Sequence, residues 1–213
     1  MKLFYSLLGL LVLASCKKQA IYVPQSDVTL LTEMADYSNI AMLYNLQNDS
    51  VQIDVKDDAT ITQTNWLFEV DKRLPLYLVI PEVKRLQDKK YKKAAEEMMP
   101  NFYTYMDTVA KTVAFMPIEH VVYELGAKPN LQENARTNQI LTIDKNGAVF
   151  LADELVDLKQ INAVLNQKFP EQPVVLSLAF DKNITFETYL QTKLNLTKIS
   201  LPNVRIATTE MVY

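Results

Sequence analysis

The sequence is poor in the residues from which many catalytic and metal sites are built. It contains one cysteine, Cys16, one histidine, His120, and three glycines. A single cysteine can form neither an intrachain disulfide nor a thiolate metal site, and a single histidine cannot supply a histidine-rich one. Three glycines in 213 residues also leave no glycine-rich loop to cradle phosphate. We therefore expect no metal and no cofactor.

An excess of positive charge is also absent. Lysine and arginine number 22 against 25 aspartates and glutamates, which gives a formal net charge of −3. Binding to nucleic-acid phosphates needs a clustered basic excess, so we expect no nucleic-acid partner.

Catalytic patterns are equally scarce. His120 falls on an alternating stretch with Val122 and Glu124, where a surface or hydrogen-bonded histidine is expected rather than a general base. Acidic residues are plentiful, but an acid-pair hydrolase needs two carboxylates that face each other across a cleft. We expect a protein that is not an enzyme and acts by binding, with an acidic-cleft hydrolase as the alternative.

The longest apolar stretch at the start of the chain is too short to cross a bilayer. Lys2 precedes the run Leu3 to Leu13, and small residues follow it, as in an export signal. A transmembrane helix needs about 20 residues. The end of the run, Leu13-Ala14-Ser15-Cys16, resembles the lipobox of bacterial lipoproteins. An ordinary signal peptide with a chance cysteine is the alternative.

The lipobox resemblance implies that Cys16 carries palmitate-type acyl chains after the signal peptide has been removed. Two or more chains hold a protein stably at a membrane, because each buried methylene contributes about 0.8 kcal/mol. The implied location is the cell envelope, anchored to the inner or the outer membrane, with the folded part facing the periplasm. We expect a signal peptide over 1–15, a lipidated tether over 16–25, an N-terminal α/β domain over 26–130 and a second domain over 131–213.

In the N-terminal half, apolar residues at helical spacing predict a helix that begins at Ser26 or Asp27 and ends near Gln47. The residues that define its apolar face are Leu30, Met34, Tyr37, Ile40 and Tyr44. Alternation then predicts a strand over 51–55, a turn at 56–58 and a returning strand over 59–61.

The C-terminal third reads as an α/β unit of order ββαβαβ. Strands are expected over 140–143 and 148–151, joined by a turn that contains Asn146-Gly147. A helix over 157–169, a buried strand over 174–179, a helix that starts near Phe186 and a strand over 203–207 follow. The same order can be traced more faintly in the first half, so we expect a degenerate duplication. The segments matched are 56–59 with 145–148, 75–81 with 173–179, 102–105 with 186–189, and 120–124 with 204–208.

The C-terminal unit, residues 139–209, looks like the periplasmic domain of the ExbD/TolR biopolymer-transport family. The likeness is carried by Leu141-Thr142-Ile143-Asp144-Lys145-Asn146-Gly147-Ala148-Val149-Phe150-Leu151, by Pro173 to Asp181 with Lys182-Asn183-Ile184-Thr185-Phe186, and by Asn203 to Thr208. The family's proteins begin with a transmembrane helix that carries an aspartate. The apolar run of this chain has no acidic residue, so the proton-coupling role is not transferable.

The resemblance implies an accessory or scaffold in a proton-motive-force-linked biopolymer transport or trans-envelope system. It implies partners of the ExbD/TolR or TonB type, contact with peptidoglycan, or a homodimer. The alternative is a lipoprotein that binds peptidoglycan or a partner without a motor. The residues that the resemblance marks for interaction are Asp181, Lys182, Phe186 and Tyr189. The residues themselves also allow a helix-capping role for Asp181 and core roles for the two aromatics.

One segment concentrates positive charge on a predicted helix. Its cations could meet anionic lipid heads or peptidoglycan carboxylates. The alternative is a solvated helix face balanced by Glu82, Asp88, Glu96 and Glu97. The residues concerned are Lys84, Arg85, Lys89, Lys90, Lys92 and Lys93.

Overall fold

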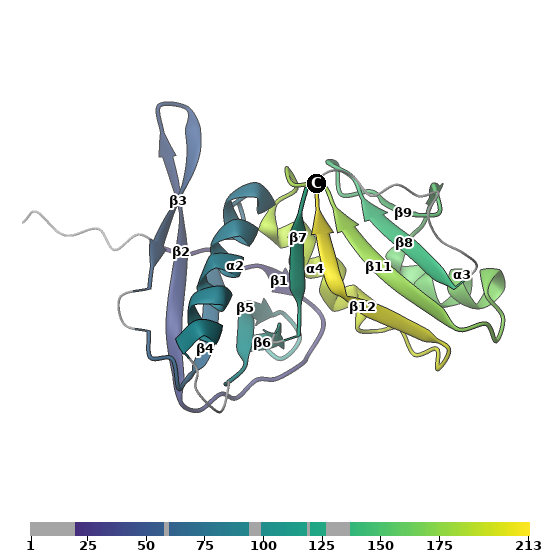
Figure 1. Cartoon of the computed structure of the whole chain (residues 1–213), viewed down its shortest axis with the longest axis horizontal. Helices are drawn as coiled ribbons and strands as arrows, with labels where there is room; N and C mark the ends of the chain where they lie inside the picture. The colour runs from purple at the N-terminus through teal and green to yellow at the C-terminus, as the bar shows by residue number, and fades with distance from the viewer. Residues whose placement is uncertain (1–19, 58–59, 94–98, 119, 127–136) are drawn as a thin grey trace, which may run out of the picture.

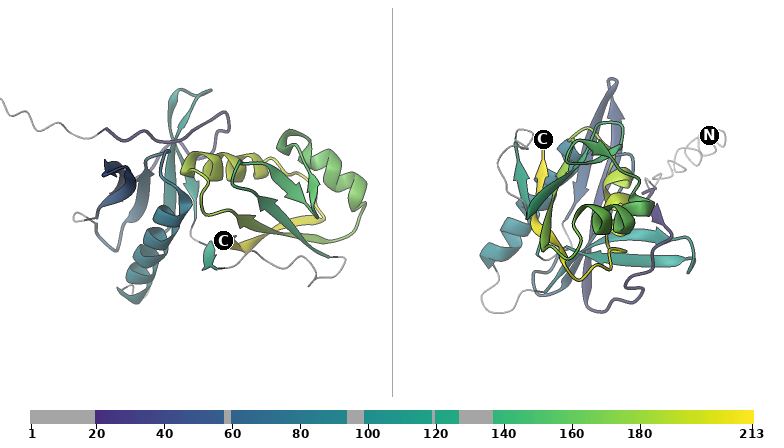
Figure 2. Two further views of the ribbon diagram at one scale, coloured as in Figure 1. Left: turned by 90° about the horizontal axis from the view of Figure 1, so that it is seen from above. Right: turned by 90° about the vertical axis from the view of Figure 1, so that its right-hand side faces the viewer.

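The protein is described by a computed structural model that covers residues 20–57, 60–93, 99–118, 120–126 and 137–213. Within these residues it is a mixed α/β protein with two mixed β-sheets and three α-helices. The two sheets lie side by side along the long axis of the molecule, as Figures 1 and 2 show. Cys16 and the signal peptide expected over 1–15 lie outside the described residues.

The first sheet has the strand order β1-β5-β4-β2-β3, and β6 also pairs with β5. β2 and β3 form an antiparallel hairpin, whereas β2, β4 and β5 run parallel to one another. The strands are β1 (Gln25–Ser26), β2 (Tyr37–Gln47), β3 (Ser50–Lys56), β4 (Asn65–Val70), β5 (Asn101–Asp107) and β6 (Thr112–Pro117).

The helix predicted from Ser26 to Gln47 is wrong, because much of that segment is strand β2. Its buried residues alternate, with Ser38, Ile40 and Met42 on the side of the sheet that is buried most deeply. The spacing of the apolar residues fits the period of a helix as well as that of a strand. The segment forms a strand because it pairs with β3 and β4. Asn48 and Asp49 both adopt positive φ, 48° and 58°, as a two-residue type I′ hairpin turn requires.

This turn also corrects the predicted position of the hairpin. The chain reverses at 48–49 rather than at 56–58, and the returning strand is β3. Thr60 and Ile61 lie outside any strand, while β4, which the sequence analysis missed, follows at Asn65.

Helix α2 (Leu76–Lys93) covers one face of the first sheet (Figure 1). Its buried residues recur at three- and four-residue spacing and pack into the same core as the inward residues of β2, β4 and β5. On the helix these residues are Leu76, Val79, Ile80, Val83 and Leu86.

The second sheet has the order β10-β9-β8-β11-β12-β7. Helices α3 and α4 lie together on one side of it (Figure 1). The elements are β7 (Val122–Leu125), β8 (Asn138–Ile143), β9 (Val149–Leu151), β10 (Glu154–Leu155), the 3-10 helix η2 (Leu158–Gln160), α3 (Ile161–Lys168), β11 (Val174–Phe180), α4 (Phe186–Leu196) and β12 (Val204–Val212).

Most predictions for the C-terminal third are confirmed at the level of single elements. The hairpin, both helices and the central strand occur where they were expected, and Gly147 has the positive φ, 80°, that its turn needs. The final strand is longer than predicted, since β12 continues to Val212. Strand β7 lies before the expected domain boundary at 130/131, yet it pairs with β12 of the second sheet.

The two sheets share a common arrangement of four strands. The orders β3-β2-β4-β5 and β9-β8-β11-β12 are equivalent, with one antiparallel hairpin followed by two parallel pairings in each. In each sheet a helix, α2 or α4, connects the last two strands. We call these two parts the first and the second unit.

The predicted duplication used the wrong alignment. Residues 75–81 begin a helix, whereas 173–179 form a strand, and residues 102–105 form a strand where 186–189 form a helix. The structurally equivalent segments are 71–76 and 181–186, which both lead from a central strand into a helix and both begin with Asp-Lys. Faint apolar matches misled the alignment because strands and helices use the same apolar residues.

These two equivalent loops also form part of the contact between the units. The amide of Leu76 donates to the Ile184 carbonyl at 3.0 Å, and the amide of Phe186 donates to the Leu74 carbonyl at 2.7 Å. A second pair of bonds has the same symmetry, from Tyr77 to Lys182 at 2.9 Å and from Glu187 to Lys72 at 3.1 Å. The units therefore face each other across an approximate two-fold relation.

The first described residues are part of the folded body. The carbonyl of Tyr22 accepts from the Lys72 amide at 2.7 Å, and the carbonyl of Pro24 accepts from the Met106 amide at 2.9 Å. The guanidinium of Arg73 lies over the rings of Tyr22 and Tyr44, 4.9 and 4.3 Å from their centroids. Of the tether expected over 16–25, the segment from Tyr22 onward is thus held against the first unit.

Candidate functional site

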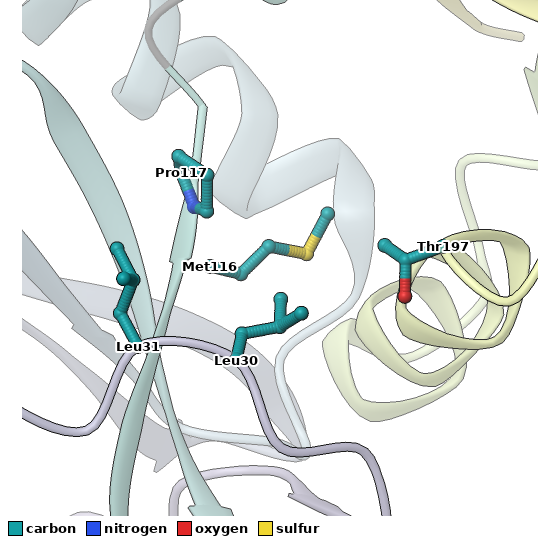
Figure 3. A pocket seen from close by; sticks show the side chains of 5 residues that line it. All are labelled: Leu30, Leu31, Met116, Pro117 and Thr197. Atoms are coloured by element: carbon teal, nitrogen blue, oxygen red, sulfur yellow. The ribbon is translucent and has the colours of Figure 1, made fainter.

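An apolar groove runs between the two units. It has a volume of about 410 Å³ and opens to solvent. Figure 3 shows its walls, with the side chain of Met116 reaching from β6 toward Thr197 at the end of α4. The lining residues are Leu30, Leu31, Met116, Pro117 and Thr197, which come from three separate parts of the chain.

The leading segment that forms one wall is fixed by hydrogen bonds. Tyr105 on β5 donates its hydroxyl proton to the Val28 carbonyl at 2.8 Å and accepts from the Leu30 amide at 3.2 Å. The carbonyl of Leu31 accepts from the Phe115 amide at 2.8 Å. Leu31 nevertheless keeps 47% of its surface exposed. The backbone of this wall is therefore fixed by hydrogen bonds, while the apolar side chain of Leu31 remains partly exposed to water.

A second hollow of about 210 Å³ adjoins the groove, and Met116 and Thr197 line both. It lies at a bulge in β12. Leu176 pairs with Ile206 and Leu178 with Glu210, so a single residue of β11 faces three residues of β12. Bulges bend a strand and redirect its side chains. We call this second hollow the bulge cavity.

A buried ion pair forms part of the wall of the bulge cavity. Lys193 of α4 pairs with Oε1 of Glu210 on β12, and their side chains are only 7% and 3% exposed. The other carboxylate oxygen, Oε2, accepts from the Tyr189 hydroxyl at 2.6 Å. Both oxygens of Glu210 are therefore used.

The hydrogen-bond network continues into the first unit. The hydroxyls of Tyr189 and Tyr123 lie 3.2 Å apart, and those of Tyr123 and Tyr103 lie 2.8 Å apart. Burial raises the pKa of each of the three phenols, and the Glu210 charge raises it further. The phenols therefore stay protonated near neutral pH and serve as hydrogen-bond groups rather than as bases.

Lys193 has more donors than partners. An ammonium carries three N–H donors. Among the residues that the structure describes, Glu210 is the hydrogen-bond partner of its Nζ, and the Tyr189 ring lies 5.5 Å away. A buried donor without an acceptor costs about 1–3 kcal/mol. Lys193 therefore has donors that no acceptor among the described residues uses.

Phe186 and Tyr189, predicted for interaction or the core, are fully buried. Their rings pack edge to face with neighbours of both units, Phe186 with Tyr103 at 4.9 Å and Tyr189 with Phe180 at 4.8 Å between centroids. Only the hydroxyl of Tyr189 takes part in the candidate site, through its bond to Glu210.

Asp181 does not cap helix α4. The N-cap is Thr185, whose hydroxyl accepts from the Thr188 amide. Asp181 instead accepts from the Asn183 amide at 2.8 Å within the preceding turn. The backbone of Lys182 binds at the unit contact, and its side chain is exposed. The predicted cap is wrong because the N-cap position is held by Thr185, four residues after Asp181.

The basic cluster of α2 is split by the fold. Arg85, Asp88, Lys89 and Lys92 surround a shallow surface hollow of about 440 Å³. Several of the cations are balanced, since Arg85 pairs with Glu82 at 2.8 Å and Lys89 with Asp57 at 3.1 Å. Lys84 also lies 4.0 Å from Asp88. This part of the cluster is a solvated face with mixed charge, and the side chain of Lys93 lies outside the described residues.

For Lys90 the predicted surface role is wrong, because the residue is fully buried. Its Nζ donates to the carbonyls of Thr64 at 3.0 Å and Met99 at 2.7 Å and to Oδ1 of Asn101 at 3.0 Å. It also lies 4.8 Å from the Trp66 ring centroid. Burial lowers the pKa of Lys90 to about 8. Lys90 thus ties the end of α2 to the start of β5.

His120 is exposed and lines the bulge cavity together with Glu210, at a site that the sequence analysis did not predict. Among the described residues, no group of three or more His, Cys, Asp or Glu side chains is placed to hold a metal ion. Within the same residues, no helix is long and apolar enough to cross a membrane.

Comparison with known proteins adds no family. A scan of models of protein families finds no match to the chain. A search of curated proteins finds no significant match either.

Sequence reasoning missed the groove, the bulge cavity and the ion pair that lines that cavity. The spacing of Phe186, Tyr189, Leu190 and Lys193 places Lys193 on the apolar face of a helix. A charged residue at such a position indicates a buried ion pair. Its partner Glu210 lies beyond the predicted end of the last strand. Because the last strand was predicted to end before Glu210, the sequence analysis did not find the Lys193–Glu210 pair.

Proposed function

We propose that the protein is a non-catalytic, lipid-anchored protein of the bacterial envelope that holds a partner protein in the groove between its two units. In this proposal Cys16 carries the acyl chains and the folded body works on the periplasmic side. The protein serves as an accessory or scaffold of a trans-envelope system of the ExbD/TolR type.

The observation that carries the binding proposal is the groove itself. Its described walls are apolar, it opens to solvent, and it is built by rigid elements of both units. Leu31 leaves 47% of its surface in water. Burying apolar surface contributes about 25 cal/mol per Å², so covering this groove with an apolar group is favourable.

The polar groups beside the groove suit binding better than proton transfer. Both oxygens of Glu210 already accept hydrogen bonds, and the raised pKa of Tyr189 keeps its phenol protonated. A general base needs a pKa near the working pH, which a buried phenol with a raised pKa does not have. These groups can orient a bound molecule without exchanging protons with it.

The test is site-specific photocrosslinking in membranes of the native bacterium. The full chain carries a photoreactive residue either at Leu31 or at Val109, which is 67% exposed on the β5–β6 turn away from the groove. We expect a discrete crosslinked product from position 31, identified by mass spectrometry as an ExbD/TolR- or TonB-type subunit. Equal crosslinking at both positions, or none at position 31, would contradict the proposal.

A second candidate function, peptidoglycan binding without a motor, is favoured by the basic hollow on α2. Arg85, Lys89 and Lys92 could meet the stem-peptide carboxylates of the cell wall. Co-sedimentation with purified peptidoglycan tests this. We expect a Lys89→Glu/Lys92→Glu variant to lose sedimentation if the function holds, whereas a Lys198→Glu variant on another surface retains it.

A further inference from the structure

We infer that the end of the β2–β3 hairpin rests in the headgroup region of the membrane, beside the acyl anchor, as a second contact with lipid. We call this part, residues 44–53, the hairpin arm. The contact rests on the anchor of the proposed function, and it determines which surface of the folded body faces the membrane. Its basis is the place of the arm, the character of its two faces and the point at which the anchored segment joins the fold.

The hairpin arm projects from the first unit. Figure 1 shows that the end of the β2–β3 hairpin extends beyond the helix and the other strands of this unit. Leu46 near the turn is 57% exposed, while Tyr44 and Ile53 at the base of the arm pack against the core. The apolar surface of the first unit therefore continues from the core out to the exposed end of the arm.

One face of the arm is apolar and the other is polar without charge. Side chains of successive residues point to opposite faces of a strand, and directly paired residues share a face. The apolar face is made by the pairs Tyr44–Ile53 and Leu46–Val51, and the polar face by Asn45–Gln52 and Gln47–Ser50. Asp49 in the turn is the single residue of the arm with a formal charge at neutral pH. An amphipathic element with so few charges suits the boundary between headgroups and acyl chains, where one face is buried and the other stays hydrated.

The segment that leads to the anchor is clamped at the base of the arm. The guanidinium of Arg73 lies over the rings of both Tyr22 and Tyr44, 4.9 and 4.3 Å from their centroids. It also donates to both carboxylate oxygens of Asp71, at 2.8 and 2.7 Å, which fixes its orientation. Tyr22 is itself 55% exposed, and tyrosine is enriched at membrane interfaces. The anchored segment and the base of the arm thus keep a fixed relation to each other.

The length of chain before the clamp keeps the arm close to lipid. Cys16 lies six residues before Tyr22. An extended chain covers at most about 3.6 Å per residue, so the clamp cannot lie farther than about 22 Å from the lipidated cysteine. From Tyr44 to the turn at Asn48 the arm is about 14 Å long, at about 3.4 Å per residue of strand. Because lipid lies within this distance wherever the anchor is inserted, lipid is the surface that the arm meets.

Fluorescence quenching by lipid tests the contact on the full lipidated chain. Cys16 is the only cysteine, so in the acylated protein Leu46→Cys adds one free thiol for a fluorophore. Leu155→Cys is the matched control, because Leu155 is a 71% exposed leucine on β10, which pairs with β9 at the opposite end of the molecule (Figure 1). The vesicles consist of phosphatidylethanolamine and phosphatidylglycerol with a nitroxide-labelled phospholipid. We expect loss of fluorescence at position 46 and no loss above background at position 155.

Two tyrosine variants test the clamp with the label at position 46. Tyr22→Ala removes the ring of the anchored segment that Arg73 covers, and Tyr37→Ala removes a tyrosine of similar exposure, 51%, at the other end of β2. Both side chains are more than half exposed, so we expect both variants to fold. The first should weaken the quenching about twofold or more, because the stacked ring holds the arm near the anchor, and the second should leave it unchanged. Quenching that Tyr22→Ala does not weaken would contradict the placement.

The outcomes separate this inference from the proposed function. An unquenched label at position 46, or equal quenching at both positions, overturns the contact and leaves the acyl anchor and the partner groove standing. A label that is unquenched in vesicles but shielded from a water-soluble quencher in native membranes would assign the arm to a partner protein and also overturn it. Two fluorophores per chain would reveal a free Cys16, which rejects the anchor and the contact together.

Discussion

Replacing Lys193 by methionine should leave Glu210 as an uncompensated charge inside the protein. The carboxylate is 3% exposed and would keep only the Tyr189 hydroxyl as a partner. Breaking a buried ion pair from one side costs about 3–5 kcal/mol, because the remaining charge stays desolvated. Glu210→Gln leaves the Lys193 ammonium without its anionic partner and should lower the stability by a similar amount.

The double variant Lys193→Met/Glu210→Gln should be far more stable than the sum of the two losses predicts. Neutral side chains of similar volume need no compensation, and such replacements are often neutral. We expect a coupling energy of about 6 kcal/mol or more, because two single losses of at least about 3 kcal/mol each are set against a double variant that is near neutral. A coupling of this size distinguishes a desolvated pair from two charges that water screens.

Urea unfolding followed by fluorescence measures these differences. Trp66 is the only tryptophan and is 1% exposed, so its emission reports on loss of the core. With a slope of about 2 kcal/mol per molar urea, each single variant should lower the midpoint by about 2 M. Single variants that lose less than about 1 kcal/mol, or losses that simply add, would refute the assignment of a buried and coupled pair.

Three further changes test other parts of the structure. Lys90→Met should remove a pH dependence of stability. Because the pKa of Lys90 is lowered to about 8 in the folded protein, the unfolded state binds more protons between pH 8 and 10.5, and the parent gains stability as the pH rises. Urea titrations at pH 7 and 9.5 should show this gain for the parent and not for the variant. Gly147→Ala should destabilise the β8–β9 hairpin by about 1 kcal/mol in thermal unfolding, because φ is +80° and the new Cβ would lie 3.0 Å from Thr188 Cγ2. Cys16→Ser should abolish labelling by a palmitate analogue and release the exported protein from membranes on fractionation; retained labelling would reject the anchor.

The elements that could be predicted are those in which local pattern and tertiary environment agree. Strand β11 is a near-continuous apolar run after a proline, and the β8–β9 hairpin contains an Asn-Gly turn. Strand β2 could not be predicted because its apolar residues fit two periods. Its neighbours β3 and β4 make the strand the better choice, since they satisfy the backbone groups along its length.

By itself, the sequence determined the α/β character, most single elements of the second unit and the scarcity of cysteine and histidine. It determined these because turn residues, prolines and apolar periodicity act over a few neighbouring positions. Only the tertiary structure decided that Lys90 is internal, that Lys193 meets Glu210, and that Leu31 and Thr197 face one groove. Those relations join residues far apart in the chain, and the packing of one unit against the other brings them together.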